Sequence, residues 1–161
     1  MRPALPALTG ILLAASFPRA GQDYLAWAAF VPLLVFIALC KGPRVSFAGG
    51  FFAAAVWNFI LLAWIPPVLV NYGGLPWAWT WGAYGLMTAV LACYPALACA
   101  AVKFLMKRRG DAMLLLFPLF WVVTEYVESY FPLGGFPWLL AGYSQSGRLV
   151  LMQAADLAGV Y

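Results

Sequence analysis

The sequence predicts an all-α protein, a polytopic bundle of transmembrane helices with its N-terminus on the cytoplasmic side. Three observations lead to this fold class. First, 66% of the 161 residues are hydrophobic and 9% are charged, whereas soluble domains are about half apolar and about a quarter charged. Second, the few charges divide the chain into apolar runs of roughly the length that a helix needs to cross a bilayer. Third, basic residues gather at alternate ends of these runs.

Five spans and the start of a sixth are expected along the chain. The predicted spans cover approximately residues 3–17, 24–40, 45–65, 77–102 and 112–131, and a truncated run begins at residue 149. The first two are short and indicate a tilted helical hairpin that turns at residues 18–23. Pro66-Pro67 is expected to end the third span, and a turn-rich loop to residue 76 follows it. Because the sixth run reaches only about 20 Å as a helix, we expect residues 1–161 to be the amino-terminal transmembrane domain of a longer protein.

The basic residues predict the orientation of these spans. With the N-terminus inside, seven basic residues lie on the inner side and two, Arg19 and Arg148, on the outer side. The inner set is Arg2, Lys41, Arg44, Lys103, Lys107, Arg108 and Arg109. The loops at 18–23, 66–76 and 132–147 therefore face outward together. The net charge of +4 is then explained by a cytoplasmic rim.

The composition also excludes several classes of function. A chain without histidine can form neither a Ser-His-Asp nor a Cys-His nucleophile, nor an H-E-x-x-H zinc site, and we expect no metal and no cofactor. Cys40, Cys93 and Cys99 have no paired spacing, which excludes a disulfide scaffold. One short basic cluster is no nucleic-acid face, so we expect no nucleic-acid partner.

Two glutamates in the fifth predicted span are the most costly residues to bury. Glu125 and Glu128 are three residues apart and share one helix face. A carboxylate at membrane depth costs several kcal/mol unless it faces protein, water or a cation, so such residues indicate function. The alternative is that one or both reach the outer interface and are hydrated.

The segment after this span is rich in glycine and aromatic residues. Its glycines allow tight turns, and Phe136, Trp138 and Tyr143 suit a membrane interface. This composition fits either a lipid- or substrate-contacting edge or an ordinary aromatic anchor. In the fourth span, Ala92, Ala96 and Ala100 form a stripe that predicts close packing against a neighbouring helix.

Residues 135–145, GFPWLLAGYSQ, closely resemble the loop after the fifth helix of bacterial apolipoprotein N-acyltransferases. Weaker likenesses to that family occur in the same order along the chain. They are Leu25-Ala26-Trp27 running into Val31-Pro32-Leu33-Leu34, then Tyr72 to Pro76, Trp121 with Thr124-Glu125, and Ala158 to Tyr161. The chain therefore resembles the amino-terminal membrane portion of this family, and only that portion.

The resemblance implies an enzyme of the bacterial cytoplasmic (inner) membrane with several spans. In that family a helical bundle carries an outward nitrilase-like domain with a Glu base, a Lys and a Cys nucleophile. The Cys takes an acyl chain from a phospholipid donor and passes it to the lipid-modified N-terminal cysteine of a lipoprotein acceptor during lipoprotein maturation. The nitrilase-like domain is absent from residues 1–161, so we expect this chain alone to be inactive. Its expected role is to anchor that domain and to form part of the lipid-entry side.

Six residues match the family's motifs and are candidates for the lipid or substrate side: Glu125, Phe136, Pro137, Trp138, Tyr143 and Gln145. One position departs from the pattern, because family members commonly carry Arg where this chain has Glu128. Two alternatives remain open. One is a non-catalytic membrane subunit or scaffold that pairs with a separately encoded nitrilase-like domain, and the other is a small membrane transporter.

Overall fold

A computed structural model describes residues 3–132 and 134–160, with the side chains of residues 157 and 158 left out, and in these ranges the chain is helical without strands. The α-helices are α1 (Ala4–Ser16), α2 (Ala26–Ala29), α3 (Val31–Leu39), α4 (Pro43–Leu61), α5 (Ile65–Asn71), α6 (Trp77–Arg109), α7 (Phe117–Glu128), α8 (Leu149–Met152) and α9 (Ala155–Ala158). The 3-10 helices are η1 (Asp23–Leu25), η2 (Asp111–Leu116) and η3 (Ala141–Gln145). The all-α prediction is confirmed. Arg2 and Tyr161, used in the sequence analysis, lie outside the described residues.

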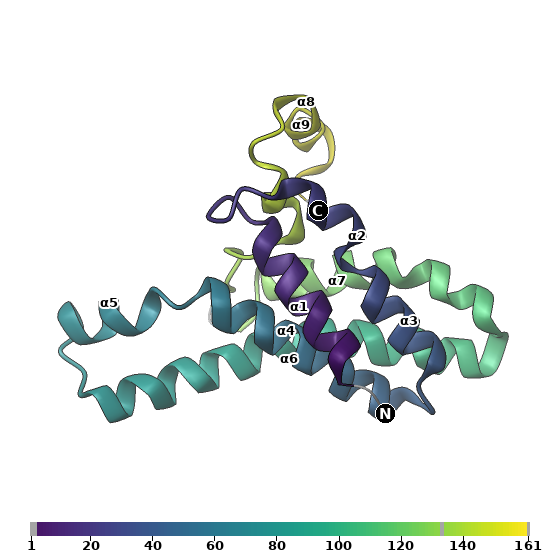
Figure 1. The fold of residues 1–161 in the computed structure, drawn as a ribbon, viewed down its shortest axis with the longest axis horizontal. Coiled ribbons are helices and arrows are strands. Elements are labelled where there is room, and N and C mark those ends of the chain that lie inside the picture. The colour runs from purple at the N-terminus through teal and green to yellow at the C-terminus, as the bar shows by residue number, and fades with distance from the viewer. Residues whose placement is uncertain (1–2, 133, 161) are drawn as a thin grey trace.

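Helices α4 and α6 form the centre of the molecule, and α1 crosses α4 obliquely (Figure 1). Helix α7 and η2 pack along α6 at one end. At the other end, α5 and the first part of α6 form a helical hairpin that extends away from the remaining helices (Figure 1). Helix α6 therefore contacts both α4 and α7.

Small residues bring α4 close to its neighbours. A β-carbon added to Gly50 would lie 2.6 Å from Cys99 Sγ and 3.1 Å from Ala96 Cα on α6. The Ser46 hydroxyl donates a 2.7 Å hydrogen bond to the Cys99 carbonyl across the same contact. The alanine stripe of α6 predicts a close approach to a neighbouring helix. The structure shows this approach at Ala96, where the facing residue on α4 is Gly50.

An aromatic cluster joins α1, α4 and α7. The ring of Trp121 lies 6.0 Å from Trp57 and 4.7 Å from Phe30, measured between ring centroids. Phe17, at the end of α1, lies 5.8 Å from Trp57. These rings are the centre of the main hydrophobic core, and they fix the position of α7 against the first half of the chain.

Several helix boundaries differ from the sequence prediction. Pro66-Pro67 stands in the first turn of α5 rather than at the end of a helix, since the first turn tolerates proline without loss of a hydrogen bond. Helix α6 continues past Val102 to Arg109, because basic side chains in its last turn interact favourably with the helix dipole. Within this extension, Lys103 Nζ donates a hydrogen bond to the Ala38 carbonyl at 3.0 Å. Residues 24–40 and 112–131 are each divided into shorter helices, and the run from residue 149 forms two single turns instead of one helix.

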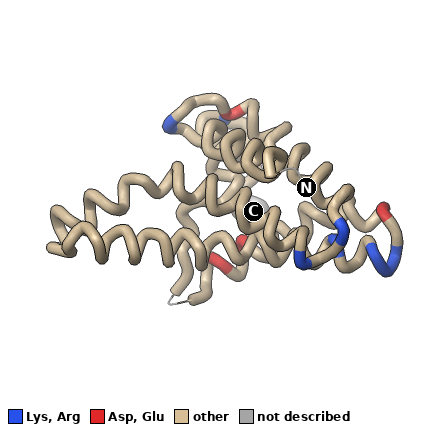
Figure 2. Tube along the Cα trace, turned by 60° about the horizontal axis from the view of Figure 1, so that its bottom comes forward, with Lys and Arg blue, Asp and Glu red and all other residues tan. Residues whose placement is uncertain are grey.

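Two of the described helices, α4 and α6, are long and apolar enough to cross a membrane, while α1 and residues 23–39 are shorter apolar helices. Many large apolar side chains are exposed, among them Leu86 and Leu39, which are 67% and 76% exposed. The charges of the described chain gather at a few connections, and those of the α3–α4 and α6–η2 connections lie at the same end (Figure 2). These features support a membrane protein.

Candidate functional site

The candidate site is formed by residues 134–148, here called the aromatic connection, which fold against the end of α7. Gly135 has a φ of +81°, and a β-carbon there would overlap the backbone of Ser129. The next residue, Phe136, donates its N–H to the Glu128 carbonyl at 3.0 Å. Glycine is therefore required at the first turn of this connection, both for the positive φ and for the close approach to α7.

Glu125 holds the middle of the connection. Its side chain is 5% exposed, and its Oε1 accepts the Ala141 N–H at 2.7 Å. The indole N–H of Trp121, one turn earlier on α7, lies beside the same carboxylate without standard hydrogen-bond geometry. A carboxylate that accepts a backbone N–H forms a strong, charge-assisted hydrogen bond. Glu125 therefore joins α7 to the start of η3.

Glu128 is buried as well, with 8% of its side chain exposed. It lies close enough to Glu125 and to the Tyr94 phenol for electrostatic interaction. Neither glutamate forms an ion pair within residues 3–132 and 134–160, and the same residues contain no group of three potential ligands able to hold a metal ion. Both carboxylates thus face protein rather than bulk water.

An aromatic stack runs from the connection to the end of α4. The rings of Phe136 and Trp138 are 5.3 Å apart at 21°, and those of Trp138 and Trp64 are 5.4 Å apart at 12°. Pro137, which lies between Phe136 and Trp138 in the sequence, is half-buried. Trp138 is 58% exposed. The sequence analysis missed Trp64. Its position before a proline pair, at the end of an apolar run, is the signal that could have singled it out.

The second half of the connection is tied to the beginning of the chain. Tyr143 packs against the main hydrophobic core, and Gln145 Nε2 donates to the Asp23 backbone carbonyl at 3.0 Å. The Asp23 carboxylate pairs with the Arg148 guanidinium. The hydrogen bond from Arg148 lowers the pKa of Asp23 below its ordinary value of 3.8. This half of the connection therefore depends on η1, more than a hundred residues earlier.

Apart from Glu125, which bonds Ala141, the six candidates therefore fall into two groups. Trp138 lies against Trp64 in the turn between α4 and α5, and Phe136, two residues earlier, packs on a second core of four buried residues. Pro137 joins the two in sequence. That core consists of Leu62, Ile65, Tyr84 and Leu91. Tyr143 and Gln145 face α1 and η1 instead. A hollow of about 290 Å³ borders these two residues and Trp27.

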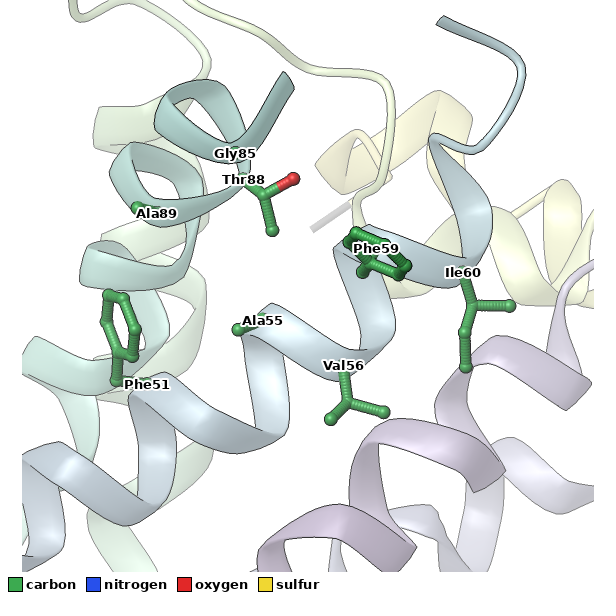
Figure 3. A pocket seen from close by; sticks show the side chains of 8 residues that line it. All are labelled: Phe51, Ala55, Val56, Phe59, Ile60, Gly85, Thr88 and Ala89. Atoms are coloured by element: carbon green, nitrogen blue, oxygen red, sulfur yellow. The ribbon is translucent and has the colours of Figure 1, made fainter. Parts of the chain in front are cut away.

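A separate apolar groove of about 430 Å³ lies between α4 and α6 (Figure 3). Phe51, Ala55 and Phe59 of α4 face Gly85, Thr88 and Ala89 of α6. The Thr88 hydroxyl is buried and has no hydrogen-bond partner among the described residues. The groove can accept an elongated apolar group.

Comparison with known proteins identifies the family. Residues 9–161 match the family model described as the apolipoprotein N-acyltransferase N-terminal domain. The chain belongs to the apolipoprotein N-acyltransferase family. The apolipoprotein N-acyltransferase of Geobacter metallireducens is 41% identical over 160 residues, which are 98% of this chain and 30% of that protein. That of Methylococcus capsulatus is 34% identical over 166 residues, 100% of this chain and 32% of its own length.

The coverage shows which part of an apolipoprotein N-acyltransferase the chain represents. The chain spans about 30% of the length of the relatives it matches, and it corresponds to their N-terminal portion. The aromatic connection, α7 and η1 all lie inside the matched residues 9–161. The site described above is therefore a feature of this N-terminal domain.

Proposed function

We propose that this chain is the membrane portion of an apolipoprotein N-acyltransferase, with several spans in the bacterial cytoplasmic membrane and its N-terminus inside. It serves an enzyme that moves an acyl chain from a phospholipid to the lipid-modified N-terminal cysteine of a lipoprotein. The family match and the gathering of basic residues at the α3–α4 and α6–η2 connections support this proposal. The acyl transfer itself belongs to a nitrilase-like domain, and the membrane portion alone is inactive.

The observation that carries the proposal is the double attachment of the aromatic connection. Glu125 bonds it to α7, and Gln145 and Arg148 bond it to η1. A connection held at its middle and at its carboxyl end gives a rigid platform, which is what a catalytic domain needs if a membrane-bound substrate is to reach it in a fixed geometry. The exposed ring of Trp138 is the part of this platform available to lipid or to the catalytic domain.

The α4–α6 groove supplies the lipid side of the same function. Its walls are apolar, and it opens on the helix faces that a membrane would cover. An acyl chain of the donor fills such a groove without exposing apolar surface to water.

A chimera tests the proposal. Residues 1–161 replace the matching segment of the Geobacter metallireducens relative, and the purified protein is given a phospholipid and a diacylated lipopeptide in detergent. We expect N-acylated peptide, read by mass spectrometry, from the chimera and none from the chain alone. Trp138→Ala is expected to lower the rate severalfold, whereas Trp79→Ala, a similarly exposed ring on α6, leaves it unchanged. A chimera that inserts and folds but transfers no acyl group contradicts the proposal, as does acyl transfer by the chain alone.

A further inference from the structure

A second groove, of about 670 Å³, lies on the other side of α4, between α4 and α1. The two helices touch at Gly10, where a β-carbon would lie 2.8 Å from Val56 Cβ and would overlap the Ala53 carbonyl. Because α1 crosses α4 obliquely, the helices separate beyond this contact (Figure 1). Ala15 of α1 and Ile60 of α4 line the walls, and Ile60 also lines the α4–α6 groove (Figure 3).

The open end of this wedge carries a positive charge. Arg19 lies in the turn after α1, which is closed by hydrogen bonds from the Ala20 and Gly21 N–H groups to the Phe17 carbonyl. The nearest acid in sequence, Asp23, is paired with Arg148. Within the described part of the chain Arg19 has no ion pair, so its guanidinium is available to an anionic ligand.

We propose that the α1–α4 groove binds a phospholipid, with its phosphate on Arg19 and one acyl chain between Ala15 and Ile60. A guanidinium binds phosphate through two parallel hydrogen bonds, and the end of a membrane helix is where a phosphate lies. The wedge closes at Gly10 and is lined mainly by apolar side chains, so it can hold a flexible acyl chain. This groove borders the α4–α6 groove at Phe59 and Ile60, which line both, and lipid binding in it requires membrane placement but no acyl transfer.

The test measures lipid binding directly. The purified chain in detergent is titrated with palmitoyl-oleoyl phosphatidylglycerol, and native mass spectrometry gives the affinity of the first bound lipid. We expect Arg19→Gln to weaken this affinity about fivefold, the factor that corresponds to about 1 kcal/mol per basic residue at a membrane surface. Ala15→Phe fills the wedge and is expected to lower the affinity at least as much. The matched controls are Arg109→Gln, in the basic end of α6, and Ala48→Phe, on an exposed face of α4, and both keep the affinity of the wild type.

A second lipid separates phosphate binding from simple apolar adsorption. Palmitoyl-oleoyl glycerol has the same chains without the phosphate, and we expect it to bind the wild type as weakly as phosphatidylglycerol binds Arg19→Gln. Arg19 is exposed in a turn, so its substitution does not threaten folding, and circular dichroism verifies the helix content of each variant. Undiminished phosphatidylglycerol binding by Arg19→Gln or by Ala15→Phe overturns the proposal, and so does equal binding of the two lipids. These results are independent of acyl transfer by the chimera.

Discussion

Replacement of Glu125 by alanine tests the central contact of the site. The carboxylate is 5% exposed and accepts the Ala141 N–H at 2.7 Å. Its removal leaves a part-buried donor without an acceptor, which costs about 2 kcal/mol for a hydrogen bond to a charged group. Since each 1.4 kcal/mol is a factor of ten in an equilibrium constant, we expect the Ala141 amide to exchange with solvent deuterium about thirtyfold faster.

The assay is hydrogen–deuterium exchange of the chain in lipid nanodiscs, with η3 as the reporter and α6 as the internal reference. Glu125→Gln keeps an oxygen that can accept the same N–H, so it is expected to show a much smaller effect than alanine. Glu128→Ala removes a buried carboxylate from the same helix face without touching Ala141, and it serves as the matched control. Unchanged exchange at Ala141 in Glu125→Ala, or an equal rise in Glu128→Ala, would refute the reasoning.

Three further predictions follow, two on contacts of this site and one on the packing of α4 against α6. Gly135→Ala is expected to destabilise the chain by about 1–3 kcal/mol in unfolding by denaturant, because the residue has positive φ and touches α7; Gly147→Ala, with open space at its β-carbon, should cost far less. The contact between Arg148 and Asp23 stabilises the fold above the ordinary pKa of 3.8 and is lost as the pH falls through the lowered pKa of Asp23; a carboxyl NMR titration measures this, and Asp23→Asn should abolish it. Gly50→Val is expected to force α4 away from α6, seen as a lower midpoint of thermal unfolding.

The sequence was sufficient for features that depend on composition and spacing. Apolar runs of spanning length and an apolar content of 66% predict an all-α chain, and the spacing of Ala92 and Ala96 predicts the tight face of α6. Glu125 stood out because a carboxylate in an apolar run is costly, and the structure shows it buried. These inferences need only the chemistry of single residues and their distance along a helix.

What the sequence could not predict depends on contacts between distant segments. The acceptor role of Glu125 requires the Ala141 N–H to come back to α7, and the ring stack on Trp138 requires Trp64 from the turn between α4 and α5. The proline pair at 66–67 was interpreted as a helix end, although the same chemistry suits a helix start. The single turns after residue 149 likewise differ from one predicted helix, since a short apolar run does not by itself determine its conformation.

The attachment of Gln145 to Asp23 has a consequence for biogenesis. The two residues are separated by 122 positions. At a synthesis rate of about 5–20 residues per second, the turn around Asp23 waits on the order of ten seconds before its partner leaves the ribosome. If the first helices insert as proposed, they do so before Gln145 holds this turn. The hydrogen bond between Gln145 and Asp23 then forms only after the later helices have been made.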